Sequence, residues 1–282
     1  MTAVTPALSS WPAVQSALTD AAGRFVTMLG TITDPNPRAV GDWSIGDTAT
    51  HVLSISHFDG YALTGTAMPD WLESGRDRVL DSVVDIAAIN AAVLDAEPER
   101  RPGVLATRIE EAFASWTPQL AGTDGAEPVV WLGGLQLPRT AVASHMVMEL
   151  LIHGHDIAHA AGHSWPIPAE DAALSLEFLV EVMRSASDRS VDEPTTGGKD
   201  VVGELRAQGV RPVVFAITGG RLSVEQPGPR PIDVRIAGDP AVLLLVMFNR
   251  VSPLRPFLRR QLKVGGRRLW RLGRLRVAMP TP

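Results

Sequence analysis

The spacing of apolar residues changes from helical to strand-like near residue 190, and this change most limits the folds open to the chain. Before it, apolar residues recur at helical spacing between start and stop signals. Pro12 suits a first helical turn, and Ser44 with Asp47 forms a capping box. These signals predict helices over about 10–29, from 44 past 58, and over 80–97, 103–120, 139–161 and 169–187.

Beyond residue 203 the apolar runs are short and rich in β-branched residues, which is typical of strands. A Gly219-Gly220 turn joins two of them into a predicted hairpin. The expected strands cover 213–218, 221–225, 232–236 and 261–264, and a helix is expected over 241–248. This part therefore predicts a small α+β domain.

A length of 282 residues suits two domains of ordinary size. The stretch Ser187–Gly203 is polar, rich in turn-forming residues and without a period, so we interpret it as a linker. The expected domains are a helical one over 1–190 and an α+β one over 191–282.

The composition excludes several classes of protein. An apolar fraction of 45% provides for a real core, and no apolar run approaches the ~20 residues of a membrane span. The N-terminus lacks the basic and apolar regions of a signal peptide, so we expect a cytoplasmic protein. The chain has no cysteine. Any thiol chemistry must therefore use a thiol brought in from outside.

The basic residues are concentrated near the C-terminus. Residues 240–282 hold no acid and ten basic residues: Arg250, Arg255, Arg259, Arg260, Lys263, Arg267, Arg268, Arg271, Arg274 and Arg276. This tail either packs against the acidic helical domain, forms a solvated face or binds an anionic ligand. An anionic membrane surface or nucleic acid is less favoured, because aromatic residues are sparse there and no nucleic-acid motif is present.

Three residues suggest a metal site. Glu149 and His153 stand four apart and therefore on one face of the helix over 139–161, and His51 sits mid-helix far upstream. One carboxylate and two imidazoles form a three-ligand site with an open position, as in catalytic zinc sites. The alternative is an ordinary solvated pair of Glu149 and His153. The apolar flanks of the pair favour an inward-facing cluster, where a metal would offset the cost of a buried carboxylate.

Three neighbours are candidates for supporting this cluster. Asp47 lies one turn before His51 and is expected to accept the other ring N–H of that histidine. Asp156 lies three residues after His153, where it can do the same. His145 lies one turn before Glu149 and is the best spare ligand.

Two segments resemble the DinB-like mycothiol-dependent maleylpyruvate isomerase family. They are Trp43–His51 (WSIGDTATH) and Glu149–Gly162 (ELLIHGHDIAHAAG). The resemblance implies a DinB-like four-helix bundle in which His51, Glu149 and His153 bind a divalent metal, usually zinc. It covers most of residues 10–190. A glutamate among the ligands is typical of the isomerase branch, since related proteins often use three histidines.

The C-terminal part resembles the sterol-carrier-like domain that often follows such a bundle. The matching pieces are VVFAI from Val213, GGRL from Gly219, DVRIAGD from Asp233 and LKVGG from Leu262. The segment after Phe248 departs from that pattern, with proline and many arginines in place of a plain turn and strand.

The resemblance implies an enzyme that uses mycothiol as its external thiol. The expected reaction is cis-trans isomerisation by thiolate addition and elimination, or a related thiol S-transfer, on a small-molecule electrophile. For a dicarboxylate substrate, Arg235 is a candidate clamp. The alternative is a non-enzymatic metal-binding protein whose C-terminal domain carries an apolar or anionic ligand. We expect no nucleic-acid partner, no integral membrane association, and a monomer or weak homodimer.

Overall fold

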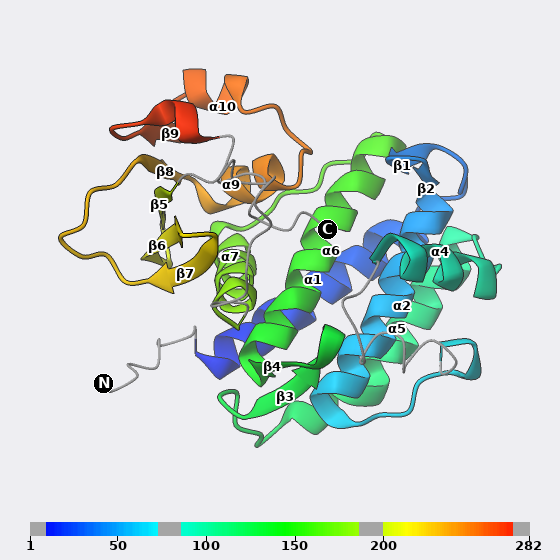
Figure 1. Cartoon of the computed structure of the whole chain (residues 1–282). Coiled ribbons are helices and arrows are strands. Elements are labelled where there is room, and N and C mark those ends of the chain that lie inside the picture. The colour runs from blue at the N-terminus through cyan, green and yellow to red at the C-terminus, as the bar shows by residue number, and fades with distance from the viewer. Residues whose placement is uncertain (1–9, 73–85, 186–199, 273–282) are drawn as a thin grey trace. The chain divides into compact units, whose positions relative to one another are not determined.

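The computed structural model describes residues 10–72, 86–185 and 200–272 (Figure 1). Contacts divide the chain into two compact units, Met1–Pro166 and Ile167–Pro282. The helix that follows Pro168 thus groups with the second unit, whereas the expected boundary lay near residue 190. Each unit is described below by itself.

The first unit is built around four long helices, which confirms the predicted bundle. Helix α1 packs against α5 and α6, and α2 packs against the same two helices. A shorter helix, α4, packs against α2. The helices are α1 (Trp11–Gly30), α2 (Ile45–Thr64), α4 (Ile86–Ala96), α5 (Pro102–Trp116) and α6 (Arg139–Ala161), with short 3-10 turns at Thr117–Leu120 and Leu132–Gly134.

The ends of α2 and α6 follow the predicted signals. The Ser44 side chain accepts a hydrogen bond from the backbone N–H of Asp47, and the Asp47 carboxylate accepts one from the N–H of Ser44. Helix α6 ends at Ala161 and is capped by Gly162, whose φ of 72° lies in the left-handed region that glycine adopts without strain. The two helices that carry the predicted ligands therefore begin or end where the sequence predicts.

Helix α6 is buried over most of its length. All its residues from Arg139 to Gly154 are buried. A helix buried on every side is normally apolar all round, but this one also buries Ser144, His145, Glu149 and His153. Its polar residues must therefore find partners inside the protein.

Two small hairpins, not predicted from the sequence, lead into the long helices. The first pairs β1 (Arg38–Val40) with β2 (Trp43–Ser44), and the second pairs β3 (Pro128–Trp131) with β4 (Leu135–Pro138). Strand β2 runs directly into α2, and β4 runs directly into α6. Strand pairing thus fixes the N-terminal ends of both helices.

The second unit is the predicted α+β domain. Its five strands have the order β7-β6-β5-β8-β9, and only the β5–β8 pair is parallel. Helix α7 packs against β6, β7 and α9. The elements are α7 (Ala169–Ser185), β5 (Val201–Ala207), β6 (Val210–Thr218), β7 (Arg221–Glu225), β8 (Val234–Gly238), α9 (Pro240–Met247), α10 (Leu254–Leu258) and β9 (Leu262–Gly265), with a 3-10 turn at Leu269–Arg271.

The β6–β7 hairpin forms as predicted, with positive φ at both Gly219 and Gly220. Strand β5 corrects the expected linker, which was drawn through Gly203. It escaped prediction because Gly203 and the buried Glu204 interrupt its apolar pattern. Residues 187–199 of that linker lie outside the described residues.

Part of the basic tail is paired within its own unit. Nη1 of Arg271 lies 3.0 Å from Oδ2 of Asp233, and Nη1 of Arg268 lies 3.4 Å from Oδ1. Arg274 and Arg276 lie outside the described residues. Within the described ranges, no helix is long and apolar enough to cross a membrane.

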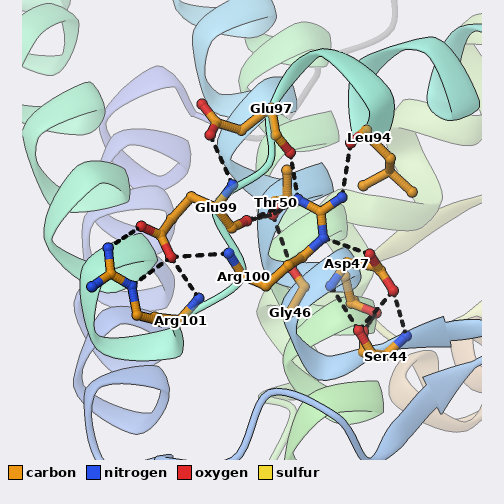
Figure 2. Close-up of polar contacts among 10 residues, drawn as sticks. Ser44, Gly46, Asp47, Thr50, Leu94, Glu97, Glu99, Arg100 and Arg101 are labelled. Atoms are coloured by element: carbon orange, nitrogen blue, oxygen red, sulfur yellow. Dashed lines mark hydrogen bonds and ion pairs between the residues drawn. The ribbon is translucent and has the colours of Figure 1, made fainter.

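Helix α2 is fixed at its N-terminal end by Arg100 (Figure 2). The Nε of Arg100 donates to Oδ1 of Asp47 at 2.6 Å, and its Nη2 donates to the carbonyl of Leu94 at 2.8 Å. The backbone of Arg100 also packs closely on Gly46, where an added Cβ would lie 2.7 Å from the carbonyl oxygen of Arg100. This position therefore requires glycine for lack of space.

We expect Gly46→Ala to lower the free energy of unfolding by about 1–3 kcal/mol, because backbone atoms cannot move aside cheaply. The matched control is Gly23→Ala in the exposed middle of α1, where no atom lies within 4 Å of the added Cβ. That variant should gain about 0.5–1 kcal/mol from helix propensity. Urea unfolding measures both, and equal stabilities for the two variants would contradict the predicted clash.

Candidate metal centre

Helices α2 and α6 pack against each other (Figure 1). This packing brings His51 together with Glu149 and His153. Nε2 of His51 lies 3.5 Å from Oε2 of Glu149, and Nε2 of His153 lies 3.1 Å from the same oxygen. One ligand atom from each residue lies within 4.8 Å of the other two. All three residues are buried, with 6–8% of their surface exposed. The cluster faces inward, so the solvated-pair alternative does not apply.

Asp156 lies beside His153, and its role in orienting that ring stays a prediction. Its Oδ2 lies 3.1 Å from Nδ1 of His153, and both residues are buried. A carboxylate on one ring nitrogen fixes the tautomer and leaves Nε2 free to act as a ligand.

His145 touches the cluster but is occupied on both ring nitrogens. Its Nδ1 lies 2.7 Å from Oδ2 of Asp59, and its Nε2 lies 3.2 Å from Oε1 of Glu149. The other oxygen of Asp59 accepts a 3.0 Å hydrogen bond from Nε1 of Trp131. His145 therefore holds the Glu149 oxygen that faces away from His51 and His153.

Asp59 is the member of this network that sequence reasoning missed. It is 1% exposed and lies eight residues after His51 on α2, just over two turns along the helix. An aspartate among apolar residues at that spacing was the available signal. Trp131 reaches it from the hairpin that precedes α6.

The structure does not place Asp47 where we expected it. Its carboxylate accepts hydrogen bonds from Ser44 and Arg100 instead of from His51 (Figure 2). Nδ1 of His51 is buried and has no hydrogen-bond partner among the described residues. The capping box and Arg100 together occupy both Asp47 oxygens, and the Trp43 ring packs 5.0 Å from the His51 ring, centre to centre.

Burial and neighbouring charged groups have opposite effects on the pKa values of the residues in this site. Burial raises the pKa of Glu149, but hydrogen bonds from His145, His153 and His51 hold that pKa well below its ordinary value. Burial lowers the pKa of both His145 and His153, yet their carboxylate partners raise these to about 10 and about 9. For His51 burial prevails, and its pKa falls below the ordinary value. The centre thus holds an anionic Glu149 beside a neutral His51.

Two imidazole nitrogens and one carboxylate oxygen are a donor set that zinc uses in catalytic sites. Here they converge in a buried place, and Nδ1 of His153 faces Asp156. The residues present therefore fit a divalent metal. The assignment of His51, Glu149 and His153 as ligands remains a prediction.

Arg235, the candidate substrate clamp, lies on β8 of the second unit. Its Nε donates a short hydrogen bond to Oε2 of Glu204, and its side chain is 45% exposed.

The first of the following solved structures supports the fold. A point mutant of the mycothiol-dependent maleylpyruvate isomerase matches 87% of this chain and 91% of its own, with 14% identity and a TM-score of 0.50. A second structure of that isomerase has 13% identity, covers 84% and 88%, and has a TM-score of 0.44. Sterol Carrier Protein 2 from Yarrowia lipolytica, in its apo form, has 10% identity, covers 41% and 98%, and has a TM-score of 0.23.

Family models match both parts of the chain. The model of the SCP-2 sterol transfer family matches residues 195–267. A search of curated proteins found no match. The model described as the mycothiol maleylpyruvate isomerase N-terminal domain matches residues 16–158, just over half of the 282 residues. The chain therefore belongs to the mycothiol maleylpyruvate isomerase family.

Proposed function

We propose that the protein is a metal-dependent enzyme that uses mycothiol as an external thiol. The reaction is of the maleylpyruvate isomerase type or a related thiol S-transfer, and the metal is zinc. The observation that carries this proposal is the buried convergence of His51, Glu149 and His153 from two helices. Membership of the family supports the same reading.

An open coordination position is what separates chemistry from a purely structural metal. His145 was the best candidate for a fourth ligand that would close the site. Its Nε2 faces Oε1 of Glu149, whereas the Nε2 atoms of His51 and His153 both face Oε2, so His145 lies outside the group of three converging ligand atoms. Three protein ligands with one free position support the enzyme over the alternative of a non-enzymatic carrier.

A divalent metal bound there supplies a Lewis acid and lowers the pKa of a thiol that reaches it. Since the chain has no cysteine, the thiol comes with the cosubstrate. Isomerisation then needs no net change of atoms: the thiolate sulfur bonds to one alkene carbon, the resulting single bond rotates, and loss of the same thiolate restores the double bond in trans.

The residues of the chain prepare the centre for this reaction. Asp156 holds His153 by one nitrogen, and His145 holds one oxygen of Glu149, so both side chains keep a fixed orientation. Burial excludes water and strengthens each electrostatic contact. We propose a small-molecule electrophile as substrate, a dicarboxylate being one candidate.

The decisive experiment compares wild type with His51→Ala. We expect purified wild type to contain about one zinc per chain and to turn over maleylpyruvate only with mycothiol. His51→Ala should lose most of its metal and its turnover, because one of three ligands is gone. The control is His159→Ala, an exposed histidine on α6, which should retain both. Metal analysis and a mycothiol-dependent assay provide the two readouts.

Wild type without metal, and without thiol-dependent activity on any electrophile tested, would rule out the enzyme. Wild type with tightly bound zinc but no such activity would favour the carrier alternative.

Asp156→Asn tests the role of the residue behind His153. We expect zinc affinity to fall by roughly 10–100-fold, because the imidazole loses the carboxylate that fixes its tautomer. Asp95→Asn, an exposed aspartate on α4, should leave the affinity unchanged. Competition with a chromophoric chelator measures both, without reference to activity. Equal zinc affinity in wild type and Asp156→Asn would show that Asp156 does not support the ligand.

A further inference from the structure

We propose that the second unit contains a binding site for a small molecule that carries a doubly charged oxyanion, such as a phosphate monoester or a dicarboxylate. The site is a cavity of about 320 Å³ on the polar side of the sheet. Four arginines contribute to its lining: Arg206, Arg230, Arg235 and Arg267. The proposal rests on this unit alone and holds whether or not the metal centre is catalytic.

A buried carboxylate, that of Glu204, positions two of the four arginines. Glu204 on β5 is 4% exposed. Its Oε1 accepts hydrogen bonds from Nε and Nη2 of Arg206, at 2.9 and 2.7 Å, and its Oε2 accepts one from Nε of Arg235. Burial raises the pKa of Glu204, but the two guanidinium groups bring it below the ordinary value. The carboxylate therefore stays charged and holds both arginines by one edge.

Strand geometry places these groups together. Glu204 and Arg206 are two residues apart on β5 and so share a face of the sheet. Arg235 is the direct neighbour of Glu204 on the parallel strand β8, and Gly265 on β9 is the next neighbour along. Nη1 of Arg206 and both Nη atoms of Arg235 make no hydrogen bond or ion pair with another described residue. Those N–H groups remain available to a ligand.

The other two arginines increase the positive charge. Nη1 of Arg230 lies 2.7 Å from each carboxylate oxygen of Glu225. Arg267 makes no hydrogen bond or ion pair with any other described residue. Four guanidinium groups therefore face two carboxylates, and a ligand with two negative charges would balance the site.

The ligand class follows from these donors. The planar guanidinium fork matches the geometry of carboxylate and phosphate groups and binds both in a bidentate manner. The volume is at the small end of the range for ligand pockets and exceeds that of a bare anion. The side chains of Pro227 and Ile232 form an apolar part of the cavity lining. The site thus suits an anionic group attached to a small organic body.

The backbone shapes one wall of the cavity. Gly266 has a φ of 127°, and an added Cβ would lie 2.3 Å from the carbonyl oxygen of Asp233. Only glycine satisfies both conditions. Arg267 follows directly, so the sharp turn after β9 sets where this arginine joins the cavity.

Isothermal titration of the full chain, at low salt and without metal or mycothiol, tests the proposal. The probes are phenyl phosphate and succinate, which distinguish a phosphate site from a dicarboxylate site. We expect saturable binding of at least one probe and weaker binding at higher salt. Arg267→Gln should weaken it roughly tenfold or more, the cost of a charge-assisted hydrogen bond.

Arg267→Gln leaves the internal pairs of Glu204 intact and should keep the fold, which thermal unfolding checks. Arg206→Gln removes a second wall donor and should weaken binding further. Arg211→Gln, an exposed arginine on β6 outside the cavity, is the matched control and should bind as wild type does. No saturable binding of either probe, or equal loss in the control, would overturn the site. Neither result would bear on metal content or turnover at the first unit.

Discussion

The pairing of the buried Glu149 carboxylate with the histidines around it is the interaction on which the first unit depends. An unpaired charge in such a place is too costly to persist. Glu149 is tolerated because three imidazoles surround it, and two of these, His145 and His153, are each held in turn by an aspartate. Hydrogen bonds extend the network from His145 to Asp59 on α2, and from Asp59 to Trp131 on β3. Polar pairing, and not only apolar packing, thus fixes how α2 and α6 face each other.

The second unit also has a buried carboxylate, Glu204, whose arginine partners are partly exposed. Glu204 sits inside a strand, where an apolar residue is the usual occupant, and two arginines from adjacent sheet positions satisfy it. The arrangement differs in one physical respect. The partners of Glu149 are enclosed, so that charge is balanced internally. The partners of Glu204 reach solvent, so positive charge remains on the outside.

Much of the fold was predictable from local signals, because caps, breakers and helical spacing act within a few residues. The capping box at Ser44 and the Gly162 end of α6 are examples. The convergence of the three candidate ligands was also predictable, since Glu149 and His153 stand one helical turn apart and His51 lies mid-helix in a segment that carries the family resemblance. Asp59 was not predicted, because its partner His145 lies 86 residues away and its spacing from His51 does not indicate that partner. Asp47 was misjudged for the opposite reason: its spacing to His51 was right, but Arg100 from a distant loop competes for its carboxylate. Strand β5 was missed because burial of Glu204 depends in part on Arg235, which is 31 residues away in the sequence.

The two hairpins have a consequence for how this fold can vary. Strands β2 and β4 continue into α2 and α6 with no intervening residue. A residue inserted at either junction would rotate every following side chain by about 100° around the helix axis. It would turn His51, or Glu149 and His153 together, out of the shared interior. Length changes are tolerable instead in the hairpin turns near Gly41 and Gly133, where positive φ values already mark open loops. The paired strands thus fix where α2 and α6 begin, and so they fix the direction in which His51, Glu149 and His153 point. The turns of the hairpins can change in length without altering this direction.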